Sequence, residues 1–122
     1  MAKILIVDDE SYVLSFLSTL LSRKGYDVVL AEDGRKGFDN FLRERPDVIV
    51  LDLQMPEMDG LTVLRQVRCL NPLQPVIILS GGSTEETEQQ VRDLGVTELV
   101  EKESAVYLLD DAVKRVLATV PA

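Results

Sequence analysis

The 122-residue chain contains no histidine and only one cysteine. The absence of histidine excludes a Ser-His-Asp triad, a histidine-ligated zinc ion and a phosphohistidine intermediate carried by this chain. The single cysteine, Cys69, excludes an internal disulfide and fits a reducing compartment. Any chemistry in this chain is therefore expected to use carboxylates, hydroxyls, lysine and metal ions.

The chain is also poor in positive charge and has no long apolar run. Its formal net charge of -8 disfavours non-specific binding to nucleic acid or to an anionic membrane surface. No apolar run approaches the length of a membrane span, and no charged leader with an apolar stretch of signal-peptide length follows Met1. We therefore expect a cytoplasmic protein that binds neither nucleic acid nor membrane directly.

Apolar strand-like runs alternate with amphipathic helical stretches along the whole chain. This alternation is typical of repeated βαβ units and predicts an α/β fold with a five-stranded parallel sheet. The length fits one domain, residues 1–122, that buries roughly two-thirds of the surface of the unfolded chain. The predicted strands are residues 3–7, 27–31, 48–52, 76–79 and 98–101. The predicted helices are about residues 11–24, 34–44, 61–71, 84–94 and 104–119.

Local signals support several of these helix ends. Gly25 and Gly95 are placed to end the first and fourth helices, and Asp33 to cap the start of the second. Ser83 and Glu86 have the spacing of a capping box at the start of the fourth helix. The segment 54–60 is rich in turn residues and is expected to shape the rim of a pocket.

Three apolar runs each end directly on a side chain that carries oxygen. Residues 4–7 lead to Asp8 and Asp9, residues 48–51 to Asp52, and residues 76–79 to Ser80. Strands buried on both faces read as continuous apolar runs, and open α/β sheets bind ligands beyond the carboxyl ends of their strands. The three runs therefore predict one acidic pocket, and crowded carboxylates are costly there unless a hard cation is bound. We interpret this pocket as a magnesium and phosphoryl site.

The acidic residues have distinct candidate roles. Asp8 and Asp9 are consecutive, so one can bind the metal directly while the other acts through water or from the side. Alternatively, Asp9 only caps the first helix. Asp52 stands at the end of a rigid strand, which suits a nucleophile that attacks phosphorus in line, and we predict that it is the phosphoacceptor. The alternative is a structural acid at a strand end.

Two further residues complete the predicted site. Ser80 can donate a hydrogen bond to a phosphoryl oxygen, or it is an ordinary turn former. Lys102 can place its ammonium against Asp52 and later against the phosphoryl group, or it is a solvated lysine at the sheet edge. The remaining charged residues of the third and fourth helices fit exposed faces and are assigned no chemistry: Arg65, Arg68, Arg92, Glu85, Glu86 and Glu88.

Together, Asp8-Asp9, Asp52, the turn 55–60, Ser80 and Lys102 resemble the receiver domain of two-component response regulators over essentially the whole chain. The resemblance implies a doubly wound, flavodoxin-like (βα)5 fold. It also implies the strand order 2-1-3-4-5 known from chemotaxis members of this family. By the same resemblance, a sensor histidine kinase or phosphotransfer protein supplies a phosphoryl group to Asp52.

The resemblance also assigns roles within the site and beyond it. Mg²⁺ is held by Asp8, Asp9, Asp52 and the backbone carbonyl of Gln54, while Ser80 and Lys102 engage the phosphoryl oxygens. The domain catalyses only its own phosphorylation and dephosphorylation, so it is a switch and not a turnover enzyme. It acts on an output protein or a fused effector domain. The last two helices and the last strand carry the readout surface, and the two helices are also a route to dimerisation.

The sequence departs from the family pattern at two positions near Lys102. Leu99 stands where most members have an aromatic residue whose rotation reports phosphorylation, and Glu103 stands where most have proline. A cis bond before a residue other than proline costs several kcal/mol, so we expect a trans bond and a reshaped loop after Lys102. Gln54 and Gly82 occupy positions that tune hydrolysis of the phosphoryl group in the family.

Two other functions remain as alternatives. The first is a receiver-like interaction module that does not depend on phosphorylation; Leu99 and Glu103 favour it, whereas the intact acids and Lys102 disfavour it. The second is a magnesium-dependent phosphatase of the haloacid dehalogenase type. That chemistry needs a second acid two residues after the nucleophile, and position 54 is glutamine.

Overall fold

Five parallel strands form one sheet in the order β2-β1-β3-β4-β5 within the residues that the computed structural model describes, which are 1–82, 84–96 and 98–119. The strands are β1 (Lys3–Val7), β2 (Asp27–Ala31), β3 (Val48–Asp52), β4 (Val76–Ser80) and β5 (Glu98–Glu101). The predicted fold class and strand order are therefore confirmed. The short, charged β5 lies at one edge of the sheet, as a strand of that composition should.

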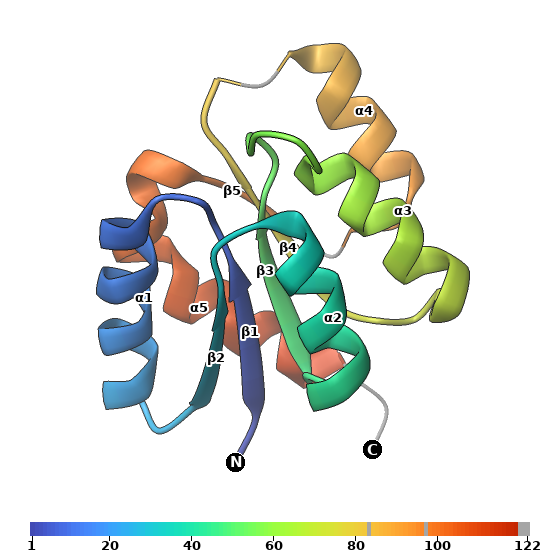
Figure 1. Ribbon diagram of the computed structural model, residues 1–122. Helices are drawn as coiled ribbons and strands as arrows, with labels where there is room; N and C mark the ends of the chain where they lie inside the picture. The colour runs from blue at the N-terminus through green and yellow to red at the C-terminus, as the bar shows by residue number, and fades with distance from the viewer. Residues whose placement is uncertain (83, 97, 120–122) are drawn as a thin grey trace.

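Helices cover both faces of this sheet, so the fold is doubly wound (Figure 1). The helices are α1 (Ser11–Arg23), α2 (Gly34–Glu44), α3 (Gly60–Leu70), α4 (Glu85–Asp93) and α5 (Ala105–Thr119). The first and last helices share one face, and α2, α3 and α4 share the other (Figure 1). No helix in the described part of the chain has both the length and the apolarity that a membrane crossing requires.

The interior strand β1 shows why a strand covered on both faces has a continuous apolar sequence. Ile4 and Ile6 pack into the core beneath α1 and α5, whereas Leu5 and Val7 pack into the core on the opposite face. All four side chains are fully buried. Successive side chains of a strand point to opposite faces, so a strand covered on both sides has no position for a polar residue until it ends.

Most helix ends agree with the sequence signals, with one correction. Asp33 caps α2 by accepting a hydrogen bond from the backbone N–H of Lys36, and Gly25 follows α1 with a left-handed φ of 95°. The capping box predicted at the start of α4 is wrong. The N-cap residue is Thr84. Its backbone is extended, and its hydroxyl accepts a hydrogen bond from the backbone N–H of Thr87. Ser83 itself lies outside the described residues.

The connection from β5 to α5 also differs from the prediction. A short 3₁₀ helix, η1 (Lys102–Ser104), precedes α5, so the α-helix begins at Ala105 and not at Ser104. No cis peptide bond occurs among the described residues, which confirms the trans bond expected between Lys102 and Glu103. The reshaped loop expected after Lys102 is therefore this 3₁₀ turn.

Arg68 was expected on an exposed helix face, and this prediction is wrong. Its guanidinium donates hydrogen bonds to the carbonyls of Leu94 at 2.6 Å, Gly95 at 2.9 Å and Gln74 at 2.7 Å. Leu94 is the C-cap residue of α4, and Gln74 lies in the loop before β4. Arg68 therefore ties the C-terminal end of α4 to the neighbouring helix and to the sheet.

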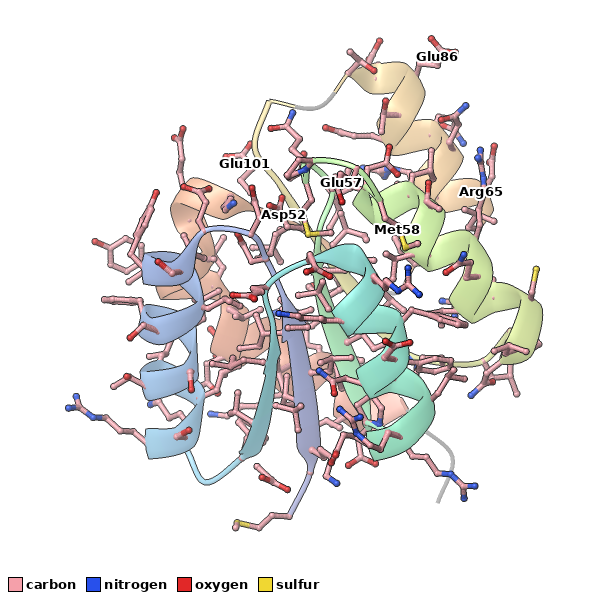
Figure 2. The ribbon with its side chains drawn as sticks, viewed as in Figure 1. Asp52, Glu57, Met58, Arg65, Glu86 and Glu101 are labelled. Carbon is pink, nitrogen blue, oxygen red and sulfur yellow. The ribbon has the colours of Figure 1, made fainter. Side chains whose placement is uncertain are left out.

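This network predicts a large loss of stability for Arg68→Ala. Removing the side chain leaves several carbonyl groups without their charged donor, which should lower the free energy of unfolding by about 2–3 kcal/mol. The matched control is Arg65→Ala, since Arg65 is exposed on the same helix (Figure 2) and should change stability by less than about 0.5 kcal/mol. Urea unfolding measures both values, and equal midpoints for the two variants would contradict the assigned role.

Candidate functional site

The carboxyl ends of three neighbouring strands bring polar side chains together at one edge of the sheet. Asp8 follows β1, Asp52 ends β3 and Ser80 ends β4. The register pairs Asp52 with Leu79 of the adjacent strand, so the two strands end within one residue of each other. The relative exposures of Asp8, Asp52 and Ser80 are only 0%, 1% and 6%. Figure 2 shows Asp52 at this end of the sheet.

The Lys102 ammonium lies among three carboxylates. Its Nζ is 3.0 Å from Oδ2 of Asp52, 3.2 Å from Oδ1 of Asp8 and 2.6 Å from Oε1 of Glu10. Only 17% of the Lys102 side chain is exposed. Lys102 is therefore not a solvated lysine at the sheet edge, and one cation partly neutralises two buried anions and a third anion at the surface.

Burial and these contacts shift the protonation equilibria in opposing directions. Burial raises the pKa of Asp8 and Asp52, and hydrogen bonds from backbone N–H groups and from Lys102 only partly offset this effect. Burial alone would lower the pKa of Lys102, but its hydrogen bonds to Glu10, Asp52 and Asp8 outweigh burial and raise that pKa. The lysine is thus held firmly in its charged form beside two carboxylates that are costly to ionise.

Glu10 belongs to this site, although the sequence analysis did not select it. It is the N-cap residue of α1 but makes no capping hydrogen bond with its side chain. Instead, it contacts Lys102 and accepts a hydrogen bond from the Tyr12 hydroxyl at 2.6 Å. The hydrogen bond from Lys102, followed by that from Tyr12, lowers the pKa of Glu10. The available signal was a third consecutive acid immediately before a helix.

Asp9 is exposed, in contrast to Asp8. The alternative that Asp9 caps the first helix is wrong, because Glu10 is the N-cap residue. The neighbouring Asp8 carboxylate instead accepts a hydrogen bond from the backbone N–H of Glu10 at 2.9 Å. Asp9 is thus available at the mouth of the acidic cluster.

The donor set fits a hard divalent cation. Asp8, Asp9 and Glu10 each offer a carboxylate oxygen, and these oxygens lie within 4.8 Å of one another. The buried Oδ2 atom of Asp8 accepts no hydrogen bond, although it lies 3.1 Å from Nζ of Lys102. A buried carboxylate oxygen without a hydrogen bond is an acceptor that a cation would satisfy, and oxygen-only ligands suit Mg²⁺.

The segment 54–60 packs tightly against the backbone at Asp52. A Cβ atom on Gly60 would lie 2.2 Å from the carbonyl oxygen of Asp52, so only glycine fits this close approach. The backbone N–H of Gln54 donates to Oδ1 of Asp52 at 3.1 Å, and the side chain of Asp59 caps α3 by accepting from the N–H of Thr62. The turn therefore fixes one oxygen of the Asp52 carboxylate.

Ser80 contacts a residue of α4. Its hydroxyl donates to Oε2 of Glu88 at 3.4 Å. Glu88 is only partly exposed, so the expectation that it lies on an exposed helix face is wrong. Leu99, at the position that is usually aromatic, is also half-buried and lines a cavity of about 370 Å³ together with Ser80 and Glu88.

Comparison with known proteins places this geometry in a family. The model of the response regulator receiver domain matches residues 4–114. Protein-glutamate methylesterase/protein-glutamine glutaminase 1 of Anaeromyxobacter dehalogenans is 38% identical over 98% of this chain and 35% of its own length. The alkaline phosphatase synthesis transcriptional regulatory protein PhoP of Bacillus subtilis is 34% identical over 94% of this chain and 48% of its own length. The chain thus spans about half or less of these relatives.

Solved structures of isolated receivers match over nearly their whole length. A response regulator receiver domain protein from Clostridium thermocellum superposes with a TM-score of 0.91 at 29% identity, covering 97% of this chain and 95% of that protein. The chemotaxis protein CheY4 of Vibrio cholerae superposes with a TM-score of 0.88 at 31% identity, covering 95% of this chain and 98% of that one.

Receiver domains generally bind Mg²⁺, interact with histidine kinases and with fused output domains, and are not themselves turnover enzymes. The matches to the family model and to these relatives extend over nearly all of this chain. The chain therefore belongs to the receiver domain family of two-component response regulators.

Proposed function

We propose that residues 1–122 form a single receiver domain in which Asp52 accepts a phosphoryl group from a sensor histidine kinase or phosphotransfer protein. Phosphorylation then changes binding to an output protein or a fused effector domain, in the cytoplasm. The observation that carries this proposal is the Lys102 ammonium held 3.0 Å from Asp52 and 3.2 Å from Asp8 in a largely buried site. A buried carboxylate beside a fixed cation is prepared for a reaction that builds negative charge.

In the proposed reaction, a carboxylate oxygen of Asp52 attacks phosphorus as the bond from phosphorus to the donor atom breaks. The donor leaves with the electron pair of that bond, and Asp52 becomes an acyl phosphate. The N–H of Gln54 holds Oδ1 of Asp52, which fixes the orientation of the carboxylate. The Lys102 ammonium can shift from the carboxylate to a phosphoryl oxygen, and the Ser80 hydroxyl can donate to another.

Asp8, Asp9, Asp52 and the backbone carbonyl of Gln54 are the proposed ligands of Mg²⁺, and Glu10 lies in the same carboxylate cluster. When bound, Mg²⁺ neutralises phosphoryl charge and orients the donor. The buried Asp8 carboxylate supports this assignment, because the Lys102 ammonium, 3.1 Å from its Oδ2 atom, only partly neutralises the buried charge that a divalent cation would balance. Domain residues thus supply both the acceptor and the groups that stabilise the transferred charge, without a separate turnover activity.

The output is proposed to follow from a shift between two arrangements of α4, β5 and α5. A ligand changes such an equilibrium only by its differential affinity for the two states, and reversing a 1:99 ratio takes about 5.5 kcal/mol. An output protein, a fused effector domain or a second copy of the chain would bind this surface. A phosphatase of the haloacid dehalogenase type is disfavoured, because Gln54 offers no acid and its N–H is bonded to Asp52.

The proposal predicts that the parent protein gains the mass of one phosphoryl group when incubated with Mg²⁺ and acetyl phosphate. Asp52→Asn should gain none, because the amide is not a nucleophile for this reaction. The control Asp39→Asn, an exposed position on α2, should react like the parent. Intact-mass spectrometry reads all three samples. A folded parent that gains no phosphoryl group would instead indicate a phosphorylation-independent interaction module.

A second prediction concerns metal binding and stability at pH 7. Burial raises the pKa of Asp8, so the folded state binds its proton more tightly and the ionised carboxylate costs stability at neutral pH. Without divalent metal, Asp8→Asn should therefore melt a few degrees above the parent, since Oδ1 can still accept from the N–H of Glu10. Thermal unfolding followed by circular dichroism measures the difference.

With Mg²⁺ the order should reverse. At about one hundred times its dissociation constant, a ligand that binds only the folded state adds about 2.7 kcal/mol. The parent should show this gain, whereas Asp8→Asn should gain little because one ligand has lost its charge. If Mg²⁺ raised the stability of both proteins equally, Asp8 would not be a ligand of the metal.

A further inference from the structure

Glu10 makes the shortest of the three hydrogen bonds to the Lys102 ammonium. Its Oε1 atom lies 2.6 Å from Nζ, whereas Oδ2 of Asp52 lies at 3.0 Å and Oδ1 of Asp8 at 3.2 Å. An ammonium group has three N–H donors, so the three carboxylates use all of its hydrogen-bonding capacity. A phosphoryl oxygen would be a fourth acceptor and must compete for the same ammonium.

Glu10 differs from the other two acceptors in its exposure to water. Its side chain is 40% exposed, whereas the side chains of Asp8 and Asp52 are 0% and 1% exposed. Water can therefore take the place of Lys102 at Glu10, but not at the buried carboxylates. Phosphoryl transfer would also convert the Asp52 carboxylate to an acyl phosphate, whereas Glu10 keeps its full charge. Glu10 is thus the acceptor that competes with a phosphoryl oxygen both before and after transfer.

The position of the Glu10 carboxylate is fixed by neighbouring groups. The Tyr12 hydroxyl donates to Oε2 at 2.6 Å, so both carboxylate oxygens of Glu10 accept hydrogen bonds. The backbone N–H of Glu10 donates to Oδ1 of Asp8 at 2.9 Å, and its carbonyl accepts from the N–H of Leu14 at 3.1 Å. The start of α1 therefore holds this carboxylate beside Lys102.

We propose that Glu10, held by Tyr12, is a positioning residue that restrains Lys102 and thereby slows phosphorylation of Asp52. This inference rests on the proposed function. In the resting protein, the contact with Glu10 draws the ammonium toward α1. Transfer builds negative charge on the phosphoryl oxygens, and these oxygens gain the full attraction of Lys102 only when the contact with Glu10 is given up. The cost of this exchange adds to the barrier.

The test compares Glu10→Ala with Glu103→Ala at saturating Mg²⁺ and equal concentrations of acetyl phosphate. The Glu10 side chain makes no capping hydrogen bond, so its removal should leave the start of α1 folded. Glu103 is exposed and lines the same cavity of about 580 Å³ as Glu10 and Lys102, but it is not one of the three carboxylates bonded to the ammonium. Intact mass gives the rate of phosphorylation of each protein.

Glu10→Ala should be phosphorylated about fivefold faster than the parent, because a competing charged acceptor is lost. Glu103→Ala should react at nearly the rate of the parent, because a solvated charge is screened. Tyr12→Phe keeps the charge of Glu10 and removes only the hydroxyl, so it should react about twofold faster than the parent. Added to Glu10→Ala, Tyr12→Phe should have no further effect, since Tyr12 acts only through Glu10. Independent structural roles would instead give additive effects.

Mg²⁺ affinity separates this role from metal binding, because Glu10 also lies in the carboxylate cluster with Asp8 and Asp9. Titration of Mg²⁺ without a phosphodonor, followed by ¹H–¹⁵N NMR, measures the affinity. Glu10→Ala should bind Mg²⁺ nearly as well as Glu103→Ala does. Much weaker binding together with slower phosphorylation would make Glu10 a metal ligand and overturn the proposal.

Equal phosphorylation rates for Glu10→Ala and Glu103→Ala, in proteins that gain the phosphoryl mass, would overturn the role of Glu10 alone. If the folded parent gains no phosphoryl group, the proposed function fails, and the role of Glu10 fails with it. The mass gain of the parent and the ratio of the variant rates therefore distinguish the two failures.

Discussion

The contact between the Lys102 ammonium and the carboxylates of Asp8 and Asp52 is the interaction on which the site depends. Both carboxylates are almost fully buried, and burial raises their pKa. Buried anions that face one another without a cation would cost several kcal/mol. Lys102 provides this cation from the connection after β5, so the edge strand and the centre of the sheet are electrostatically coupled. The same cation is available to the charge that a transferred phosphoryl group would add.

The architecture was predictable because the strands are covered on both faces. Such strands must be apolar at every position, and each apolar run therefore ends where the sheet ends. That rule predicted from the sequence alone that Asp8, Asp52 and Ser80 lie at one edge of the sheet. The structure places all three there. The strand order came from the resemblance to receiver domains and not from the apolar pattern. Helix ends were less certain, as the shift of the α4 cap from Ser83 to Thr84 shows.

The side-chain contacts were less predictable because they join distant parts of the chain. Lys102 and Asp8 are 94 positions apart, and Arg68 reaches a carbonyl 26 positions away. The sequence around an arginine or glutamate on an amphipathic helix is the same whether the side chain is solvated or contacts another helix or loop. Arg68, Glu88 and Glu10 were therefore misjudged or missed, although their residue types fit the contacts that they make.

The departures from the family pattern lie together around one cavity. Leu99 replaces the usual aromatic residue, and Glu103 lies in a 3₁₀ turn with a trans peptide bond before it. Glu88 of α4 lines the same cavity and accepts a hydrogen bond from the Ser80 hydroxyl at 3.4 Å.

The most direct test of the account is to locate the acyl phosphate in the chain. Hydride reduction of the protein after reaction with acetyl phosphate and Mg²⁺ converts a phosphorylated aspartate to a stable alcohol, which peptide mass spectrometry can place. The account predicts reduction at position 52 only. Reduction at Asp8 or Asp9, or no reduced residue in a protein that carries the added mass, would contradict it.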